Sequence, residues 1–229
     1  MQANSSPVIS SQTGIHDHLN AVVARHAATT FLKPVMPYNR AAFNMAVAAW
    51  QIAGAKPLIL DAGCGVGLST FNLATQFPDH FVIGVDQSAH RLARNTVWSG
   101  PLPSNCMRIR ADMVDIWRLM QDADIRPARQ YVLYPNPWPK MGQLGRRWHG
   151  HPVFPTIAAL GGHLECRSNW RIYIEEFAAA LTQLGHVTTC EPYSTAAPIT
   201  PFEQKYLASG HALWHCETRL AKASVGYAK

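Results

Sequence analysis

The feature that most constrains the fold of this chain is a glycine-rich turn between a short apolar strand and a helix. The apolar run 58–60 is followed by Asp-Ala-Gly-Cys-Gly-Val-Gly at residues 61–67, and a helix is predicted directly after it, at about 68–76. Glycines in such a unit let the backbone turn tightly and let a ligand lie against it without side-chain obstruction. The unit predicts an α/β fold with a nucleotide-like ligand over the turn.

Helical and strand-like segments alternate along the rest of the chain. Helices are predicted at residues 40–52, 89–98, 113–120 and 170–184, and strands at 81–85, 107–109, 131–134, 163–166, 186–190 and 212–218. This alternation predicts a Rossmann-like α/β fold, with a mostly parallel seven-stranded sheet and helices on both faces. We expect residues 1–20 to be a disordered arm, residues 21–229 to form a single domain, and residues 140–155 to be a mobile loop.

The composition gives information on the binding partners and the cellular compartment of the protein. Lysine and arginine outnumber aspartate and glutamate by 20 to 14, and the resulting charge of +6 favours a polyanion such as a nucleic acid without identifying one. The five cysteines are scattered, and His149 and His151 lack patterned acidic or cysteine neighbours, so we predict neither disulfides nor a metal. No apolar run reaches the about 18 residues of a membrane span. A cytoplasmic protein is therefore expected, and its oligomeric state is left open.

Three side chains narrow the ligand expected over the turn. Asp86 closes the second predicted strand, where a carboxylate can accept both ribose hydroxyls of an adenosine-containing cofactor. A dinucleotide site would need a further glycine at the position of Leu68. Asp61, in front of the glycines, suits a donor with a cationic methionine end. The turn is therefore predicted to bind S-adenosylmethionine, and a dinucleotide oxidoreductase is the less favoured alternative.

A third aspartate, Asp112, follows the third predicted strand. Enzymes that use S-adenosylmethionine hold the adenine amino group at this position. Its alternative role is to cap the helix at 113–120. Asp86 has a similar alternative, although Ser88 could cap the next helix equally well. Both alternatives stay open at this point.

Three further stretches of the sequence carry a family resemblance. They are Tyr-Pro-Asn-Pro-Trp-Pro-Lys at 134–140, Ser-Asn-Trp at 168–170 with Tyr173, and Thr-Pro-Phe-Glu-Gln-Lys at 200–205 followed by Gly-His-x-Leu-Trp at 210–214. In order and spacing they resemble the Pro-Asp-Pro-Trp-His-Lys, Thr-Asp-Trp-x-x-Tyr, Thr-Lys-Phe-Glu-x-Arg and Gly-His-x-x-Trp segments of the bacterial tRNA (guanine-N7)-methyltransferase family. The resemblance covers roughly residues 58–219.

The resemblance implies a class I S-adenosylmethionine-dependent methyltransferase that modifies N7 of a guanine in tRNA. It assigns to the methyl donor Asp61, Gly63, Gly65, Gly67, Asp86, Asp112 and Asn136. It assigns to the nucleoside side Lys140, Arg146, Arg147, Asn169, Thr200, Pro201, Phe202 and Glu203. Guanine N7 has no proton to remove, so the reaction needs alignment more than a general base. Asn136 and Glu203 are predicted to act in catalysis, because acceptors near the base stabilise the positive charge that the purine gains.

The sequence departs from the family pattern where charge matters. Asn136 and Asn169 stand where the family has aspartate, so each keeps a carbonyl acceptor and loses a negative charge. The basic run after Trp138 is also thinned, which would hold fewer phosphates. Three alternatives therefore stay open: a catalytically altered or inactive protein of this fold that binds RNA or a partner, a methyltransferase for another base, and one for a small molecule. Thr200 and Glu203 also have an alternative role without substrate binding, in which Thr200 caps a helix and Glu203 lies in its first turn.

Overall fold

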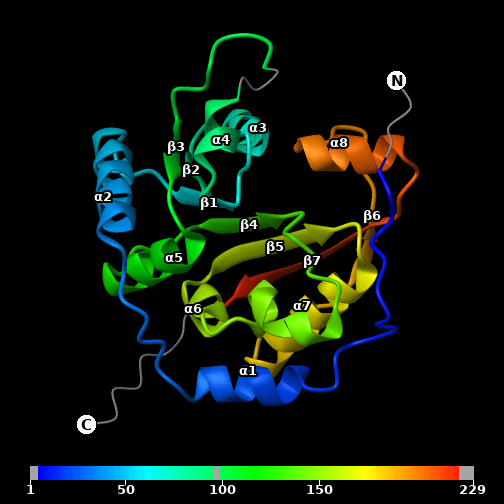
Figure 1. The fold of residues 1–229 in the computed structure, drawn as a ribbon. Coiled ribbons are helices and arrows are strands. Elements are labelled where there is room, and N and C mark those ends of the chain that lie inside the picture. Colours follow the sequence, from blue (N-terminus) through cyan, green and yellow to red (C-terminus); the bar gives the residue numbers. More distant parts are fainter. Residues whose placement is uncertain (1–4, 95–97, 222–229) are drawn as a thin grey trace.

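The computed structural model describes residues 5–94 and 98–221, which build a single sheet with helices on both faces (Figure 1). The strands are β1 (Leu58–Ala62), β2 (Phe81–Asp86), β3 (Cys106–Arg110), β4 (Arg129–Leu133), β5 (Gly162–Ser168), β6 (Glu191–Tyr193) and β7 (Leu213–Leu220). Their order is β3-β2-β1-β4-β5-β7-β6, and only β7 runs antiparallel to its neighbours. The predicted seven-stranded, mostly parallel sheet is confirmed.

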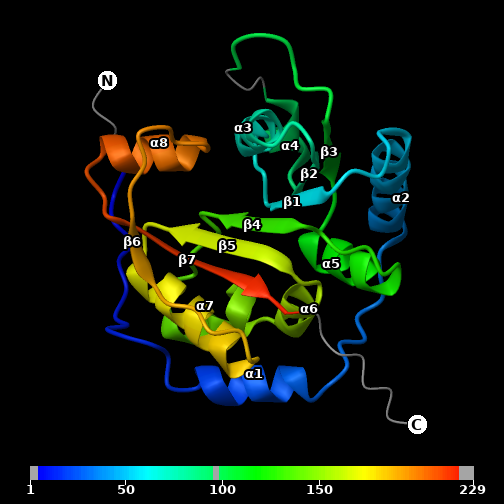
Figure 2. The same ribbon diagram turned by 180° about the vertical axis from the view of Figure 1, so that it is seen from behind.

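The helices divide between the two faces of the sheet. They are α1 (Leu19–Ala27), α2 (Pro37–Ile52), α3 (Leu68–Gln76), α4 (Ala89–Ala93), α5 (Met113–Asp122), α6 (Phe154–Ala159), α7 (Arg171–Gln183) and α8 (Pro201–Ala208), with the short 3-10 helices η1 (Met141–Arg146) and η2 (Trp148–Gly150). Helices α1, α2, α5, α6 and α7 bury the larger apolar core against one face. Helices α3, α4 and α8 lie on the other face (Figures 1 and 2).

The alternation of side chains along β1 explains how an acidic residue comes to face α3. Leu58, Leu60 and Ala62 pack into the larger core, whereas Ile59 packs into the core under α3 and α8. Successive side chains of a strand point to opposite faces, so Asp61 lies on the same face as Ile59. The strand therefore delivers a carboxylate to the first turn of α3.

Two predicted elements differ from the observed ones. The strand predicted at 186–190 is wrong, because pairing with β7 begins only at Glu191, opposite His215. In the predicted stretch, the Thr188 hydroxyl rather than its backbone N–H donates to the carbonyl of Glu217, at 2.7 Å. The helix predicted at 89–98 ends at Ala93, since the next residue is extended. Residues 95–97 lie outside the described residues.

The expectations of a disordered arm and a mobile loop also differ from the structure. Residues 5–20 follow the surface of the molecule and bury Gln12, His16 and Leu19, whereas residues 1–4 lie outside the described part. The stretch 140–155 forms η1, η2 and the start of α6, with Leu144 and Val153 buried. The two segments share buried polar contacts, because Gln12 and Arg147 bond to each other and both bond to Glu176 of α7.

Two findings concern the expected membrane spans and disulfides. Among the residues that the structure describes, no helix has both the length and the apolar character that a membrane crossing requires. The five cysteines are free thiols.

Candidate active site

The candidate site lies at the carboxyl edge of the sheet, where the chain switches direction. Strands β1 and β4 are parallel neighbours, yet the chain continues from β1 toward β2 and β3 on one side and from β4 toward β5 on the other. Such a switch point leaves a crevice in which α/β proteins bind ligands. The glycine turn follows β1 and the segment 134–140 follows β4, so both bound this crevice.

The glycine turn has the open, left-handed backbone that the sequence predicts. Gly63, Gly65 and Gly67 have φ values of 79°, 60° and 87°, which L side chains rarely adopt. A Cβ atom on Gly63 or Gly65 would meet no atom within 4 Å, so the space beside them is open to a ligand. A Cβ on Gly67 would lie 2.3 Å from Cδ of Arg108, so this glycine packs against the protein.

Arg108 of β3 supports the turn from its covered side. Its guanidinium donates to the carbonyl of Val66 at 2.7 Å and lies 4.9 Å from the centre of the Phe71 ring. No signal in the sequence singles out this residue, because a single arginine in a short strand carries no pattern. Arg108 therefore ties the turn to β3 and to the first turns of α3.

Asp86 accepts hydrogen bonds from the glycine turn and from the residue before α4. Its carboxylate is 3% exposed; Oδ2 accepts from the backbone N–H of Gly65 at 3.0 Å, and Oδ1 accepts from that of Ser88 at 2.7 Å. The Ser88 hydroxyl, not Asp86, caps α4 by accepting from the N–H of Arg91. The capping role thus belongs to Ser88, and Asp86 is left as a carboxylate at the edge of the glycine turn.

Asp61 is a buried carboxylate with a perturbed pKa. It is 1% exposed, and Oδ2 accepts from the hydroxyls of Ser69 and Thr70, both at 2.7 Å. Burial raises the pKa of Asp61 to about 6; the two hydroxyl bonds lower it, and the charge of Asp86 raises it further. Because burial disfavours the charged form, a cation bound nearby would restore ionisation. The site is therefore suited to a positively charged ligand group.

Asp112 caps α5, as its alternative role predicts. Its Oδ1 accepts from the N–H of Val114 at 3.0 Å, and Oδ2 lies 3.8 Å from Nζ of Lys33. The side chain is 30% exposed, so part of the carboxylate remains accessible at the carboxyl edge. The capping role is confirmed, and the contact with adenine remains a prediction.

The loop after β4 presents Asn136 between two strained residues. Tyr134 and Trp138 have φ values of 52° and 46°, in the left-handed region that non-glycine residues seldom occupy. Each such residue costs on the order of 1–3 kcal/mol, and such residues cluster at functional sites. The Asn136 side chain is exposed and has no hydrogen-bond partner within the described ranges. Its amide is therefore available to a ligand.

Glu203 lies behind this loop and is fully buried. Its Oε1 accepts from the Tyr134 hydroxyl at 2.7 Å and from the Arg167 guanidinium at 3.0 Å, and Oε2 accepts from the N–H of Ile199 at 2.7 Å. Thr200 caps α8 by accepting from the Glu203 N–H. Both oxygens therefore have protein partners, and a catalytic contact of Glu203 stays a prediction. Through Tyr134 the carboxylate is bonded to the loop after β4.

The predicted basic contacts separate into surface and interior residues. Lys140 and Arg146 are exposed, and the Arg146 guanidinium lies 4.8 Å from the centre of the Trp138 ring. Arg147 is fully buried in an ion pair with Glu176, with 2.5 Å between Nη1 and Oε2. The structure therefore contradicts the prediction that Arg147 contacts substrate, because its guanidinium is buried and paired with a carboxylate inside the protein.

The remaining residues that are predicted to contact the nucleoside lie around α8. Asn169 Nδ2 is 3.2 Å from Nδ1 of His211. Pro201 and Phe202 are exposed on the first turn of α8, which is joined to α3 through a 3.0 Å hydrogen bond from Asn72 to the carbonyl of Ile199. This contact places the start of α8 beside the helix that follows the glycine turn.

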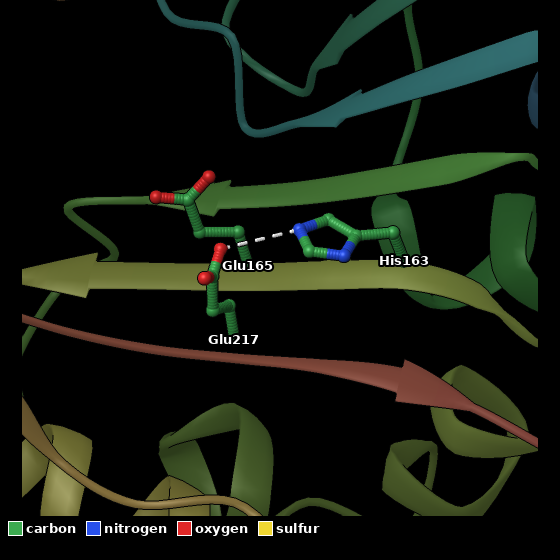
Figure 3. A group of neighbouring side chains, drawn as sticks. All are labelled: His163, Glu165 and Glu217. Atoms are coloured by element: carbon green, nitrogen blue, oxygen red, sulfur yellow. Dashed lines mark ion pairs between the residues drawn. The ribbon is translucent and has the colours of Figure 1, made fainter.

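One group of side chains within the described residues has the composition of a metal site. His163 and Glu165 of β5 and Glu217 of β7 have potential ligand atoms within 4.8 Å of one another (Figure 3). His163 Nε2 lies 3.3 Å from an oxygen of Glu217, and Arg167 Nε lies 2.6 Å from an oxygen of Glu165. Each carboxylate thus has a nitrogen partner, and we describe the group as ion pairs within the sheet. Sequence reasoning missed the polar alternation that places Arg167 in this row.

The chain is similar in sequence to a known protein family and to named bacterial proteins. A family model described as "Putative methyltransferase" matches residues 55–216. The tRNA (guanine-N(7)-)-methyltransferase of Stutzerimonas stutzeri is 27% identical over 170 residues, covering 69% of this chain and 70% of its own. The protein of the same name from Bordetella pertussis is 29% identical over 197 residues, covering 78% and 72%.

Solved structures of low sequence identity share the fold. The 16S rRNA methyltransferase KamB superposes with a TM-score of 0.54 at 17% identity, over 82% of this chain and 97% of that one. A mutant 16S rRNA (adenine(1408)-N(1))-methyltransferase from Catenulisporales acidiphilia, with the cosubstrate SAM, gives a TM-score of 0.53 at 19% identity, over 77% and 92%. Since the family model spans well over half of the sequence, the chain belongs to this methyltransferase family.

Proposed function

We propose that this methyltransferase uses S-adenosylmethionine to methylate N7 of a guanine in tRNA. The names of its sequence relatives support this substrate. The observation that carries the proposal is the 2.7 Å hydrogen bond between Tyr134 and Glu203, because it joins the two segments that resemble the tRNA (guanine-N7) family beside the glycine turn. An enzyme acting on tRNA would work in the cytoplasm.

On the donor side, the carboxylates match the cationic and polyhydroxyl parts of S-adenosylmethionine. Asp86 is bonded to Gly65 of the glycine turn, at the end of β2, where it can accept from ribose hydroxyls. Asp61 offers a negative charge for the methionine ammonium. The donor itself supplies an electrophilic methyl group on a sulfonium, and the chain orients it over Gly63 and Gly65.

On the acceptor side, the chain has to align a guanine rather than deprotonate it. N7 carries an in-plane lone pair, so transfer needs an in-line approach and no general base. Asn136 supplies an exposed amide whose carbonyl can stabilise the positive charge that develops on the purine. The Arg146 guanidinium over Trp138 and the nearby Lys140 offer an exposed cationic and aromatic surface suited to RNA.

The direct test is to incubate the protein with methyl-labelled donor and total tRNA and to identify the modified nucleoside. We expect label in 7-methylguanosine, and far less label at the same donor concentration with protein carrying Asp86→Ala. A second candidate, a donor-binding protein without transfer, is favoured by the neutral residues Asn136 and Asn169. Donor binding measured by calorimetry, without label in any nucleoside, would support that second candidate and contradict methylation of guanine.

The variant Asn136→Asp should increase the single-turnover rate of methyl transfer by about 10-fold. A carboxylate makes a charge-assisted contact with the cationic product-like purine, which is roughly twice as strong as a neutral one. The rate should be measured at saturating donor and tRNA. Asn169→Asp is the matched comparison, because it restores a family aspartate at a side chain held by His211. A lower rate for Asn136→Asp would show that the neutral amide is required.

Donor binding should release a proton near pH 6. The pKa of Asp61 is about 6 in the free protein because burial disfavours its charged form. A methionine ammonium beside it favours the carboxylate and lowers that pKa, so donor affinity should fall as the pH is lowered from 7 to 5. Calorimetry in buffers of different ionisation enthalpy measures the released proton. Asp61→Asn should abolish the pH dependence; its persistence in that variant would place the ammonium elsewhere.

A further inference from the structure

The N-terminal arm, residues 5–18, runs along the carboxyl edge of the sheet from beside α8 to α1 (Figures 1 and 2). At its start, the carbonyl of Ser5 lies 2.9 Å from Nε2 of His211, the ring whose Nδ1 meets Asn169. Further along, the hydroxyl of Ser10 donates to the carbonyl of Pro139 at 2.6 Å. The arm thus touches both sides of the proposed acceptor site, the loop after β4 and the segment after α8.

Gln12 connects the arm to a buried ion pair. Its Nε2 donates to Oε1 of Glu176 at 2.5 Å, and its Oε1 accepts from Arg147 at 2.9 Å. The same Glu176 oxygen accepts from the backbone N–H of His16 at 3.0 Å. Glu176 and Arg147 are both fully buried, so these polar groups depend on one another for partners. The arm therefore completes a network that would otherwise leave buried groups unpaired.

The other face of the network holds the loop that carries Asn136. The Arg147 guanidinium donates to the carbonyl of Trp138 through both Nε and Nη2, at 3.1 Å each, and Nη2 lies 3.4 Å from the carbonyl of Lys140. The chain of contacts therefore runs from the arm, through one guanidinium, to the backbone of residues 138–140. Ser10 adds a direct bond to the same stretch.

We propose that Ser10 and Gln12 are positioning residues for methyl transfer: the arm holds the loop after β4 in the shape that presents Asn136 to the acceptor base. This inference rests on the proposed function, and it adds a segment outside all of the family-like motifs to the acceptor site.

The strain in the loop explains why such support is needed. Trp138 occupies the left-handed region, and a strained conformation persists only when its surroundings over-determine it. Tyr134, on the other side of Asn136, is held by β5 and α8 through Arg167 and Glu203. Only the side toward Trp138 depends on the arm. Loss of the arm contacts would let this side relax, and a misplacement of about 1 Å can cost about 100-fold in rate.

The test compares adjacent serines. Ser10→Ala removes the bond to Pro139 and the bond from the Gln12 N–H, and Ser10→Thr keeps a hydroxyl. Ser11→Ala removes an exposed hydroxyl with no side-chain bond among the described residues. Two quantities are measured: hydrogen exchange of the backbone amides of residues 138–147, and the single-turnover rate of methyl transfer to tRNA. We expect Ser10→Ala to speed exchange and to lower the rate by about 10-fold at unchanged donor affinity, and Ser10→Thr to restore both. Ser11→Ala should match the unaltered protein.

Gln12→Met provides a second variant of similar size that lacks both amide bonds, and it should change the same two quantities in the same direction. Unaltered exchange in both Ser10→Ala and Gln12→Met would overturn the proposal. Faster exchange with an unchanged transfer rate would also overturn it, because the loop would then not need the arm for catalysis. If the unaltered protein does not methylate tRNA, the proposed function fails, whereas exchange still reports whether the arm holds the loop.

Discussion

Replacing Asp86 by alanine should weaken the binding of S-adenosylmethionine by about 100-fold. The carboxylate lies beside the glycine turn and accepts from Gly65, so its removal takes away an anchor of the turn and, in the proposed donor site, the partner of two ribose hydroxyls. A hydrogen bond to a charged group contributes about 1.5–3 kcal/mol, and 1.4 kcal/mol corresponds to about 10-fold in affinity. Two such bonds account for the expected loss.

Calorimetric titration with the donor measures this effect, and thermal unfolding of the same samples reports whether the variant is folded. Asp79→Ala is the matched control, because Asp79 is an exposed aspartate just before β2, at the opposite end of that strand from Asp86. It should bind the donor like the unaltered protein. Unchanged affinity in a folded Asp86→Ala variant would mean that the donor does not lie over this turn.

The second large effect is expected from Glu176→Gln, which should lower the free energy of unfolding by about 3–5 kcal/mol. The substitution leaves the fully buried Arg147 guanidinium without its counter-charge, and breaking a buried pair costs about that much. Glu175→Gln on the same helix is the control. Glu175 pairs with Arg171 near the surface, so its loss should cost about 0.5 kcal/mol or less. Denaturant unfolding measures both values, and equal values would contradict the buried-pair assignment.

The same carboxylate should make the protein sensitive to acid. Burial alone would raise the pKa of Glu176, but the hydrogen bonds and charges of His149 and Arg147 lower it from 4.5 to about 2. Because the folded-state pKa is depressed, the stabilisation is complete above pH 4.5 and is lost as the pH falls toward 2. The shift corresponds to about 3 kcal/mol. Glu176→Gln should remove this part of the acid sensitivity, and an unchanged pH profile of stability would contradict it.

Local patterns predicted most of the fold and the glycine turn at its carboxyl edge. The bounds of α3 were predicted to the residue, because a glycine before Leu68 and a buried periodic face define that helix locally. Asp86 and the glycines could be placed at the site because strand ends and turns are local features. By contrast, β6 was misplaced, since a short edge strand is defined by its partner β7 and not by its own three residues.

The sequence by itself determined the α/β class, the glycine turn with its acidic neighbours, and the family-like segments at 134–140 and 200–205. Only the tertiary structure decided what the charged residues do. Arg147 and Glu203 read as surface contacts along the chain, yet each is buried against partners 29 and 36 residues away, Glu176 and Arg167 respectively. The arm likewise became ordered only through Glu176, which lies 164 residues from Gln12. The physical reason is that the cost of burying a charge depends on partners brought together by folding, which no local pattern contains.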